Sequence, residues 1–116
     1  MREFVVGAND TNVKAFHILE QASVLTIHHA HSDNIKRVRY AQKHIVMSAS
    51  ADKTMKLWDL RNSSEPLDSV RLPQPLEDFC QLQDLREYVV ANGAMLNVIK
   101  LTEDLRFERL AEYKAF

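Results

Sequence analysis

Three residues in the middle of the chain have the side chains that hydrolytic enzymes use for nucleophilic catalysis. Ser48 offers a hydroxyl, His31 an imidazole and Asp52 a carboxylate. In such a triad the imidazole takes the serine proton and the carboxylate orients the imidazole. Catalysis also requires hydrogen-bond donors for the developing oxyanion, and no motif that supplies them accompanies these residues. Because that motif is missing, we expect no catalytic site and no enzymatic activity.

A second group of residues, the tract His28-His29-Ala30-His31, has the composition of a metal site. On a strand, His29 and His31 would point to the same face, as two zinc ligands do. However, no cysteine lies nearby, so the tract lacks a common zinc ligand. We expect no metal site and no cofactor.

The composition bounds the class of protein. With 116 residues, 46% of them hydrophobic and 27% charged, the chain is typical of one soluble globular domain. A formal charge of −1 gives no overall basic field for nucleic acid, and the basic run 36–39 is predicted to be a solvated face. Cys80 is the single cysteine, which fits a reducing compartment and predicts a small buried side chain. The apolar run near the N-terminus is too short for a signal or membrane segment.

The elements that must position Ser48 and Asp52 lie in the stretch 45–61. Its first part, 46–50, has the β-branched and small residues of a strand buried on both faces. A turn follows at 51–53, where the Asp52 side chain can accept from the backbone two residues on. A second strand is predicted from Thr54 to Leu60, and it contains Trp58.

This stretch resembles the second half of a WD repeat. The resemblance is carried by Ser48-Ala49-Ser50, Asp52, Thr54, Lys56 and Leu57-Trp58-Asp59, with His31 at the place of the family's Gly-His. It implies a β-propeller, in which each unit of about 40–45 residues forms one four-stranded blade. It also implies a structural tetrad of hydrogen-bonded side chains, which are His31, Ser48, Asp52 and Trp58. Such a tetrad is physically reasonable because a buried imidazole needs partners for both ring nitrogens.

The pattern repeats at an offset of 42 positions, since Asp10 precedes Asp52 and Phe16 precedes Trp58 by that distance. We therefore expect an all-β, partial WD-repeat β-propeller of about two to three antiparallel four-stranded blades. The expected units are a partial blade with strands two to four in 1–30, a complete blade in 31–72, and a degenerate blade with a C-terminal tail in 73–116. In the last unit Gly93 and Ile99 replace the turn aspartate and the tryptophan, so no tetrad is expected there. Beyond residue 102 we expect a strand and then a short helical or frayed end.

An open arc of blades has physical consequences. Propellers close when the last blade pairs with the first, and an open arc leaves apolar blade faces and unpaired strand edges exposed. We expect the chain to be a fragment of a longer propeller, a truncated gene product, or a piece that requires a partner, with poor stability on its own.

A second resemblance concerns function. The segments 31–38, 58–70, 74–79 and 89–101 resemble consecutive blades of the propeller subunit of the small-subunit processome, a U three snoRNA-associated, nucleolar family. A departure occurs at Ile99-Lys100, where that family tends to keep Trp-Asp. The resemblance implies a non-catalytic scaffold for protein–protein interactions in small-subunit ribosome biogenesis and pre-rRNA processing, located in the nucleus and nucleolus. The implied partners are other proteins of a multi-subunit complex, with RNA contact only indirect and with no membrane and no small-molecule substrate.

An alternative function rests on another resemblance. The segment 46–61 resembles the box with which some propellers dock on the adaptor of cullin-RING ubiquitin ligases. That resemblance implies a substrate receptor in which Asp59 and Arg61 contact the adaptor.

Overall fold

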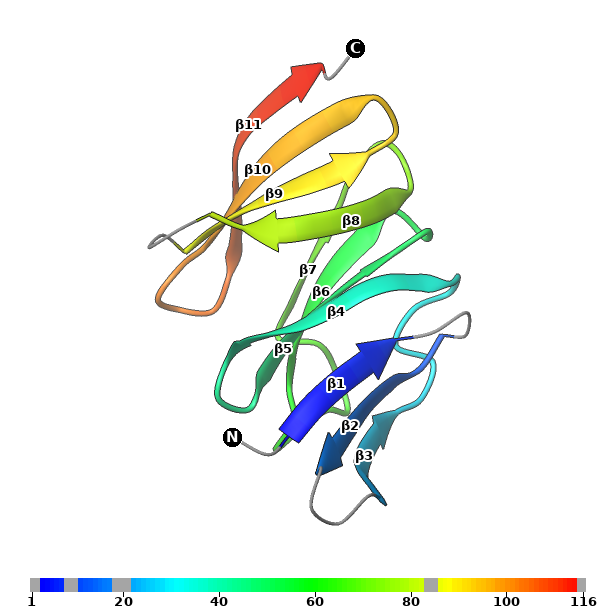
Figure 1. Cartoon of the computed structure of the whole chain (residues 1–116). Coiled ribbons are helices and arrows are strands. Elements are labelled where there is room, and N and C mark those ends of the chain that lie inside the picture. Colours follow the sequence, from blue (N-terminus) through cyan, green and yellow to red (C-terminus); the bar gives the residue numbers. More distant parts are fainter. Residues whose placement is uncertain (1–2, 8–10, 18–21, 83–85, 115–116) are drawn as a thin grey trace.

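The computed structural model describes residues 3–7, 11–17, 22–82 and 86–114, and within these ranges every regular element is a β-strand. The strands form three antiparallel sheets that follow one another along the chain and stack face to face (Figure 1). We call them the N-terminal, central and C-terminal sheets. The expected all-β class is confirmed.

The strands follow the sequence order within each sheet. The N-terminal sheet has the order β1-β2-β3, with β1 at Glu3–Gly7, β2 at Val13–His17 and β3 at Ala22–Ile27. The central sheet has the order β4-β5-β6-β7, with β4 at Ile35–Gln42, β5 at Ile45–Ser50, β6 at Thr54–Asp59 and β7 at Asp68–Arg71. The C-terminal sheet comprises β8 at Leu76–Gln81, β9 at Glu87–Asn92, β10 at Met95–Leu101 and β11 at Phe107–Lys114.

The burial of β5 shows why the sheets stack. All six residues of this strand are buried, so both of its faces are covered. Its neighbour β4 forms the edge of the central sheet and lies beside both β1 and β8, which belong to the flanking sheets. A strand that is covered on both faces has a continuous run of small and apolar residues in its sequence. Residues 45–50 have this pattern.

Two apolar clusters hold the three sheets together. Between the N-terminal and central sheets lie Val13, Ile27, Ala30, Ile35, Val46 and Trp58. Between the central and C-terminal sheets lie Ile45, Met47, Ala49, Met55, Leu57, Leu72, Leu76, Phe79, Tyr88, Val90, Ile99 and Leu101. Full burial of one large apolar side chain stabilises a fold by about 1.5–3 kcal/mol, so these clusters are the main source of cohesion between sheets.

Two tight turns join the inner strands of the central and C-terminal sheets. Lys53 has a φ of 76° in the turn between β5 and β6, and Gly93 has a φ of 65° in the turn between β9 and β10. Glycine adopts this left-handed conformation without steric cost. A Cβ at Gly93 would also lie 3.3 Å from Cγ of Gln74, so the turn is closely packed as well.

The basic run 36–39 lies at the surface, and one of its side chains forms an ion pair that the sequence did not predict. Lys36 and Arg39 are exposed, but the guanidinium of Arg37 forms two hydrogen bonds to the carboxylate of Asp78, at 2.6 Å and 2.9 Å. Asp78 lies on β8, so this pair links the central sheet to the C-terminal sheet. The pair is itself exposed to solvent, but the sequence did not predict it, because nothing in the sequence shows that a carboxylate of the next sheet lies opposite Arg37.

The segment beyond residue 102 is a strand over most of its length. Strand β11 pairs with β10 from Phe107 to Lys114, with a register shift between Val98 and Ile99. A helical end is therefore excluded up to Lys114. As an outer strand, β11 leaves Leu110 and Tyr113 exposed, at 44% and 59% of their surface.

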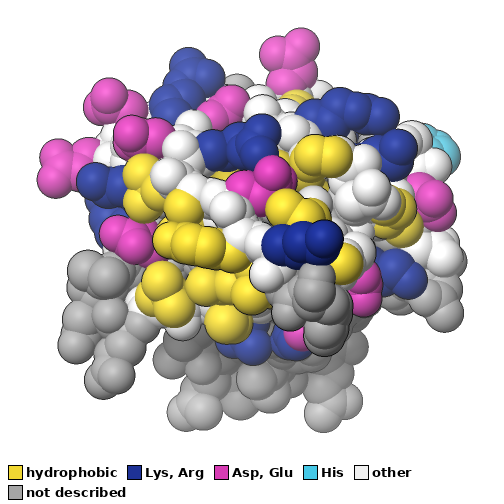
Figure 2. Space-filling view, turned by 90° about the horizontal axis from the view of Figure 1, so that it is seen from above, with side chains coloured by type: hydrophobic (Ala, Val, Ile, Leu, Met, Phe, Trp, Pro, Cys, Tyr) yellow, Lys and Arg dark blue, Asp and Glu magenta, His cyan; other side chains and the backbone are white. Residues whose placement is uncertain are grey.

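Cys80 is exposed, so the prediction that it is buried was wrong. On β8, Phe79 points into the core between sheets, and strand alternation turns Cys80 to the opposite face of the C-terminal sheet. There it borders a shallow hollow together with Val89, Ala91 and Leu96. Figure 2 shows hydrophobic side chains gathered on this end of the molecule, bordered by charged groups. None of the described residues forms a helix that is long and apolar enough to cross a membrane.

Candidate functional site

The structure brings His31, Ser48, Asp52 and Trp58 into one hydrogen-bonded chain in the central sheet. Ser48 lies on β5, Trp58 on β6 and Asp52 in the turn between these strands, while His31 precedes β4. The Trp58 Nε1–H donates to Ser48 Oγ at 2.9 Å, and Ser48 Oγ lies 2.6 Å from His31 Nε2. At the other side of the ring, His31 Nδ1 lies 2.9 Å from Asp52 Oδ2.

The donor and acceptor capacities of these side chains determine which atoms of the network carry the protons. Trp58 Nε1 can only donate, so Ser48 Oγ accepts from it and uses its own proton toward His31 Nε2. His31 Nε2 is then an acceptor, and Nδ1 carries the proton that is donated to Asp52. The imidazole is neutral in this arrangement, and both of its nitrogens are satisfied.

The pKa values agree with this assignment. Burial lowers the pKa of His31 below its ordinary value of 6.5, and it outweighs the raising effect of the neighbouring Asp52. For Asp52, burial alone would raise the pKa, but hydrogen bonds from Thr54 and Ser32 outweigh it and lower the pKa below 3.8. A neutral histidine beside a charged carboxylate is therefore the stable state at neutral pH.

The same geometry is unsuited to catalysis. Ser48 has no exposed surface and His31 has 2%, so a substrate carbonyl cannot approach the hydroxyl. Ser48 Oγ also accepts the Trp58 hydrogen bond, which reduces its electron density and holds it in place. The arrangement connects four segments of the central sheet and leaves no reactive group facing solvent.

Further polar residues complete the network, and the sequence analysis gave them no role. Thr54 donates its amide and its hydroxyl to Asp52 Oδ1, and the Ser32 amide donates to Asp52 Oδ2 at 3.1 Å. Ser50 Oγ accepts from the Asp52 amide at 3.0 Å and donates to the carbonyl of Asn34 at 2.9 Å. The signal that would have found Ser50 and Thr54 is local: serine and threonine within two residues of a turn aspartate often bond to it. Ser32 lies 20 positions from Asp52 in the sequence, so no local signal identifies it.

Asp59 and Arg61, the residues of the alternative docking site, bind each other. The Arg61 guanidinium donates to both carboxylate oxygens of Asp59 at 3.0 Å, and the Arg61 amide donates to Oδ1 at 2.9 Å. This hydrogen bonding lowers the pKa of Asp59 and raises the pKa of Arg61. The Arg61 side chain remains 64% exposed, so it is accessible, but its charge is already paired.

The C-terminal sheet contains a different buried polar group. Ile99, at the place of the tryptophan, is fully buried and apolar. Asn97 and Asn92, on β10 and β9, are also fully buried, and Asn97 Nδ2 donates to Asn92 Oδ1 at 2.7 Å. Arg109 of β11 donates to Asn97 Oδ1 at 3.3 Å. A buried amide pair thus occupies this part of the C-terminal sheet.

The histidine tract does not converge on one point. His31 is committed to Ser48 and Asp52, whereas His28 and His29 are exposed in the turn that follows β3. Across the part of the chain that the structure describes, no three metal-binding side chains lie close enough to share an ion.

Solved structures with the same architecture identify the fold. The chain matches a chain in the crystal structure of the mitotic checkpoint complex with a TM-score of 0.83 and 14% identity, over 99% of this chain and 36% of that one. It matches the C-terminal WD40 domain of Sif2 with a TM-score of 0.79 and 22% identity, over 95% of this chain and 32% of that one. The fold is a partial WD40 β-propeller. The three sheets therefore correspond to blades, and both the central and the C-terminal sheet have four strands.

A third propeller extends the comparison. The β-propeller domain of Cps50 (Swd1) from Myceliophteria thermophila matches with a TM-score of 0.77 and 18% identity, over 94% of this chain and 35% of that one. The chain thus spans about a third of the length of the solved propellers that it matches. No family model and no curated protein matches the sequence.

Proposed function

We propose that this chain is part of a non-catalytic WD40 propeller scaffold that assembles with other proteins. The observation that carries the proposal is the buried chain of hydrogen bonds from Trp58 through Ser48 and His31 to Asp52, which commits these polar side chains to contacts within the fold. These hydrogen bonds stabilise the fold. Binding to other proteins is therefore left to the rims and turns of the blades. One solved structure with the same fold is a chain of the mitotic checkpoint complex, a multi-protein assembly.

We further propose that the scaffold acts in nucleolar small-subunit ribosome biogenesis and pre-rRNA processing. Support comes from the resemblance of 31–38, 58–70, 74–79 and 89–101 to consecutive blades of the processome's propeller subunit. RNA contact is expected to be indirect, because Arg37 of the basic run is bound to Asp78. The expected location is the nucleus and nucleolus.

The alternative function, a substrate receptor of a cullin-RING ligase, is not favoured by the geometry. An adaptor would have to separate the Arg61 guanidinium from Asp59, with which it shares two hydrogen bonds. Loss of these hydrogen bonds would reduce the net binding free energy of any new contact at Arg61.

Affinity capture from cells that express the tagged protein tests these proposals. We expect subunits of the small-subunit processome among the captured proteins, and nucleolar localisation of a fluorescent fusion. The matched control is Trp58→Ala, which removes the packed indole and should abolish capture by unfolding the central blade. Recovery of a cullin adaptor without processome subunits would support the alternative, and recovery of neither with a folded protein would refute the nucleolar assignment.

A further inference from the structure

A cleft of about 540 Å³ opens where the N-terminal and central blades meet. Thr11 of the N-terminal blade lies on one wall, and its carbonyl accepts a hydrogen bond from the His31 amide at 3.2 Å. The opposite wall comes from the central blade. The volume is in the range of pockets that hold a small ligand or one large side chain.

Strand alternation explains which side chains of the central blade face this cleft. Thr54, Lys56 and Trp58 alternate along β6 and therefore share one face of the strand. Thr54 is directly opposite Arg71 in the register of β6 and β7, so Arg71 lies on the same face. On this face Trp58 is buried, whereas Lys56 and Arg71 line the cleft.

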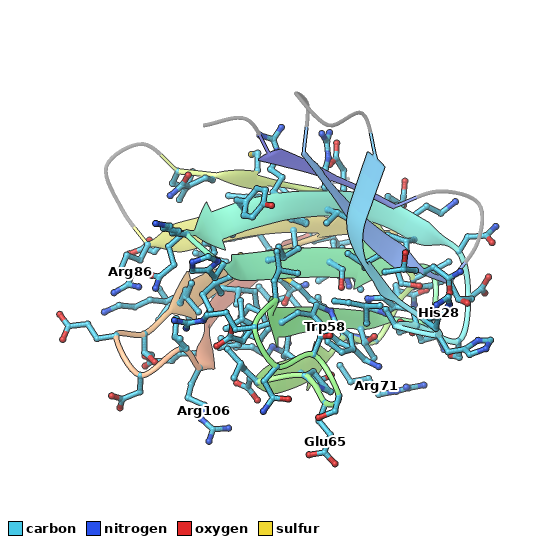
Figure 3. The ribbon with its side chains drawn as sticks, turned by 90° about the horizontal axis from the view of Figure 1, so that it is seen from below. His28, Trp58, Glu65, Arg71, Arg86 and Arg106 are labelled. Carbon is cyan, nitrogen blue, oxygen red and sulfur yellow. The ribbon has the colours of Figure 1, made fainter. Side chains whose placement is uncertain are left out.

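The two basic side chains of the cleft lack a carboxylate partner within the described part of the chain. Lys56 Nζ donates to the Ala30 carbonyl at 3.0 Å and lies 5.9 Å from the centroid of the Trp58 ring. An ammonium has three donors, so Lys56 retains capacity for another acceptor. Arg71 is exposed, and Figure 3 shows its side chain extending outward from the ribbon on the side where His28 lies.

The carboxylate in the cleft is directed inward. The Asp52 side chain is only 7% exposed, and its oxygens accept hydrogen bonds from His31, Thr54 and Ser32. Its charge is thus bound within the polar network, and the two cations outnumber it. Hydroxyl groups of Thr11 and Ser32 add neutral donors around the opening.

We infer that this cleft is a binding site for an anionic side chain of a partner protein, either a phosphorylated serine or threonine or a glutamate or aspartate. A guanidinium binds the oxygens of phosphate and carboxylate in pairs, and a nearby ammonium adds a second positive charge. An open cleft with two basic side chains fits one anionic group. Nucleic acid instead requires basic residues along a track. The inference rests on the proposed scaffold function and assigns a partner chemistry to one of its surfaces.

Direct binding measurements test the site without knowledge of the partner. The probes are three fluorescently labelled peptides of one glycine-rich sequence that carry phosphoserine, glutamate or serine at their centre, together with an oligouridylate. Titration of the folded protein at low salt should show binding of the phosphoserine and glutamate peptides and none of the serine peptide. The binding should weaken as salt is added, because the contact is ionic.

Substitutions assign the binding to the cleft. Arg71→Gln should weaken binding of the anionic peptide about tenfold or more, which corresponds to the loss of one charge-assisted contact. Arg71→Lys should restore part of it. Arg39→Gln is the matched control, because Arg39 is an exposed arginine on β4 that does not line the cleft. Lys56→Gln is a second test, read only from protein with an unchanged unfolding midpoint, because Lys56 also packs on Trp58.

Each outcome decides the inference. Tighter binding of phosphoserine than of glutamate would identify a phosphorylated partner, and the reverse order an acidic one. Absence of binding, equal binding of the serine peptide, an effect of Arg39→Gln equal to that of Arg71→Gln, or tighter binding of oligouridylate would overturn it. Because these measurements use no cellular partner, failed affinity capture would count against the scaffold proposal alone.

Discussion

The Trp58 indole donates its single hydrogen bond to the Ser48 hydroxyl at 2.9 Å, and both side chains are buried. The same indole belongs to the buried apolar cluster that includes Val13 and Ile27 of the N-terminal blade. One side chain therefore completes the polar network of the central blade and fills the apolar interface with its neighbour.

Removal of the Trp58 side chain should be strongly destabilising. We expect Trp58→Ala to lower the free energy of unfolding by about 3–5 kcal/mol, because a large buried side chain is lost and a cavity remains. Trp58→Phe keeps most of the apolar surface but removes the N–H donor, so its cost should be smaller, about 1–3 kcal/mol. Urea unfolding of the three proteins measures the difference. A near-neutral effect of Trp58→Ala would show that the indole is not packed as described.

Acid should destabilise the protein in two steps. The pKa of His31 is lowered in the folded state, so the unfolded state binds its proton first, and stability is lost as pH falls below 6.5. The pKa of Asp52 is also lowered, so its contribution is present above pH 3.8 and is lost as pH falls below that value. We expect the urea midpoint to be lower at pH 5 than at pH 7.5.

The control for the acid effect is His31→Gln. A glutamine cannot titrate, so this variant should be less stable than the native protein at pH 7.5 but should lose the drop between pH 7.5 and pH 5 that His31 causes. The comparison variant is His28→Gln, which replaces an exposed histidine that lies outside the hydrogen-bonded network. An unchanged pH profile in His31→Gln would show that another group titrates.

Much of this architecture was predictable because blade strands have strong local signals. The run 45–50 and the turn at Asp52 define a hairpin from composition alone, and the resemblance to WD repeats added the expected partners of Ser48. Contacts between blades were not predictable, because they depend on which surface residues meet across the stack. The pair Arg37–Asp78, the cleft with Lys56 and Arg71, and the exposure of Cys80 all belong to this class.

Arg61→Ala separates a solvated turn residue from a docking residue. The guanidinium is exposed and its one described ionic partner, Asp59, adjoins it in the same turn. We therefore expect no change in the melting temperature, as for most exposed substitutions. We also expect unchanged recovery of a cullin adaptor in affinity capture, because the alternative function is not favoured. Sharply reduced adaptor recovery with an unchanged melting temperature would revive the ligase function, since arginine is a frequent hot spot of interfaces.

Replacing both asparagines of the buried amide pair in the C-terminal blade should destabilise the protein less than replacing one of them. Asn97 Nδ2 donates to Asn92 Oδ1 at 2.7 Å, and within the described residues Asn92 Nδ2 has no hydrogen-bond partner. Asn92→Leu alone leaves the Asn97 amide without its acceptor, so it should cost about 1–3 kcal/mol.

The double substitution removes both amide groups, so neither asparagine is left with a buried polar atom that lacks a hydrogen-bond partner. Asn92→Leu with Asn97→Leu replaces the pair by apolar groups of similar shape beside the buried Ile99, so the double variant should be near neutral or more stable than the native protein. Arg109, whose side chain is 45% exposed, then turns its donor to water or to Glu112. A double-mutant cycle by urea unfolding measures the coupling between the two sites. Additive costs would instead show that each asparagine is stabilised by separate contacts and that the pair is not a unit.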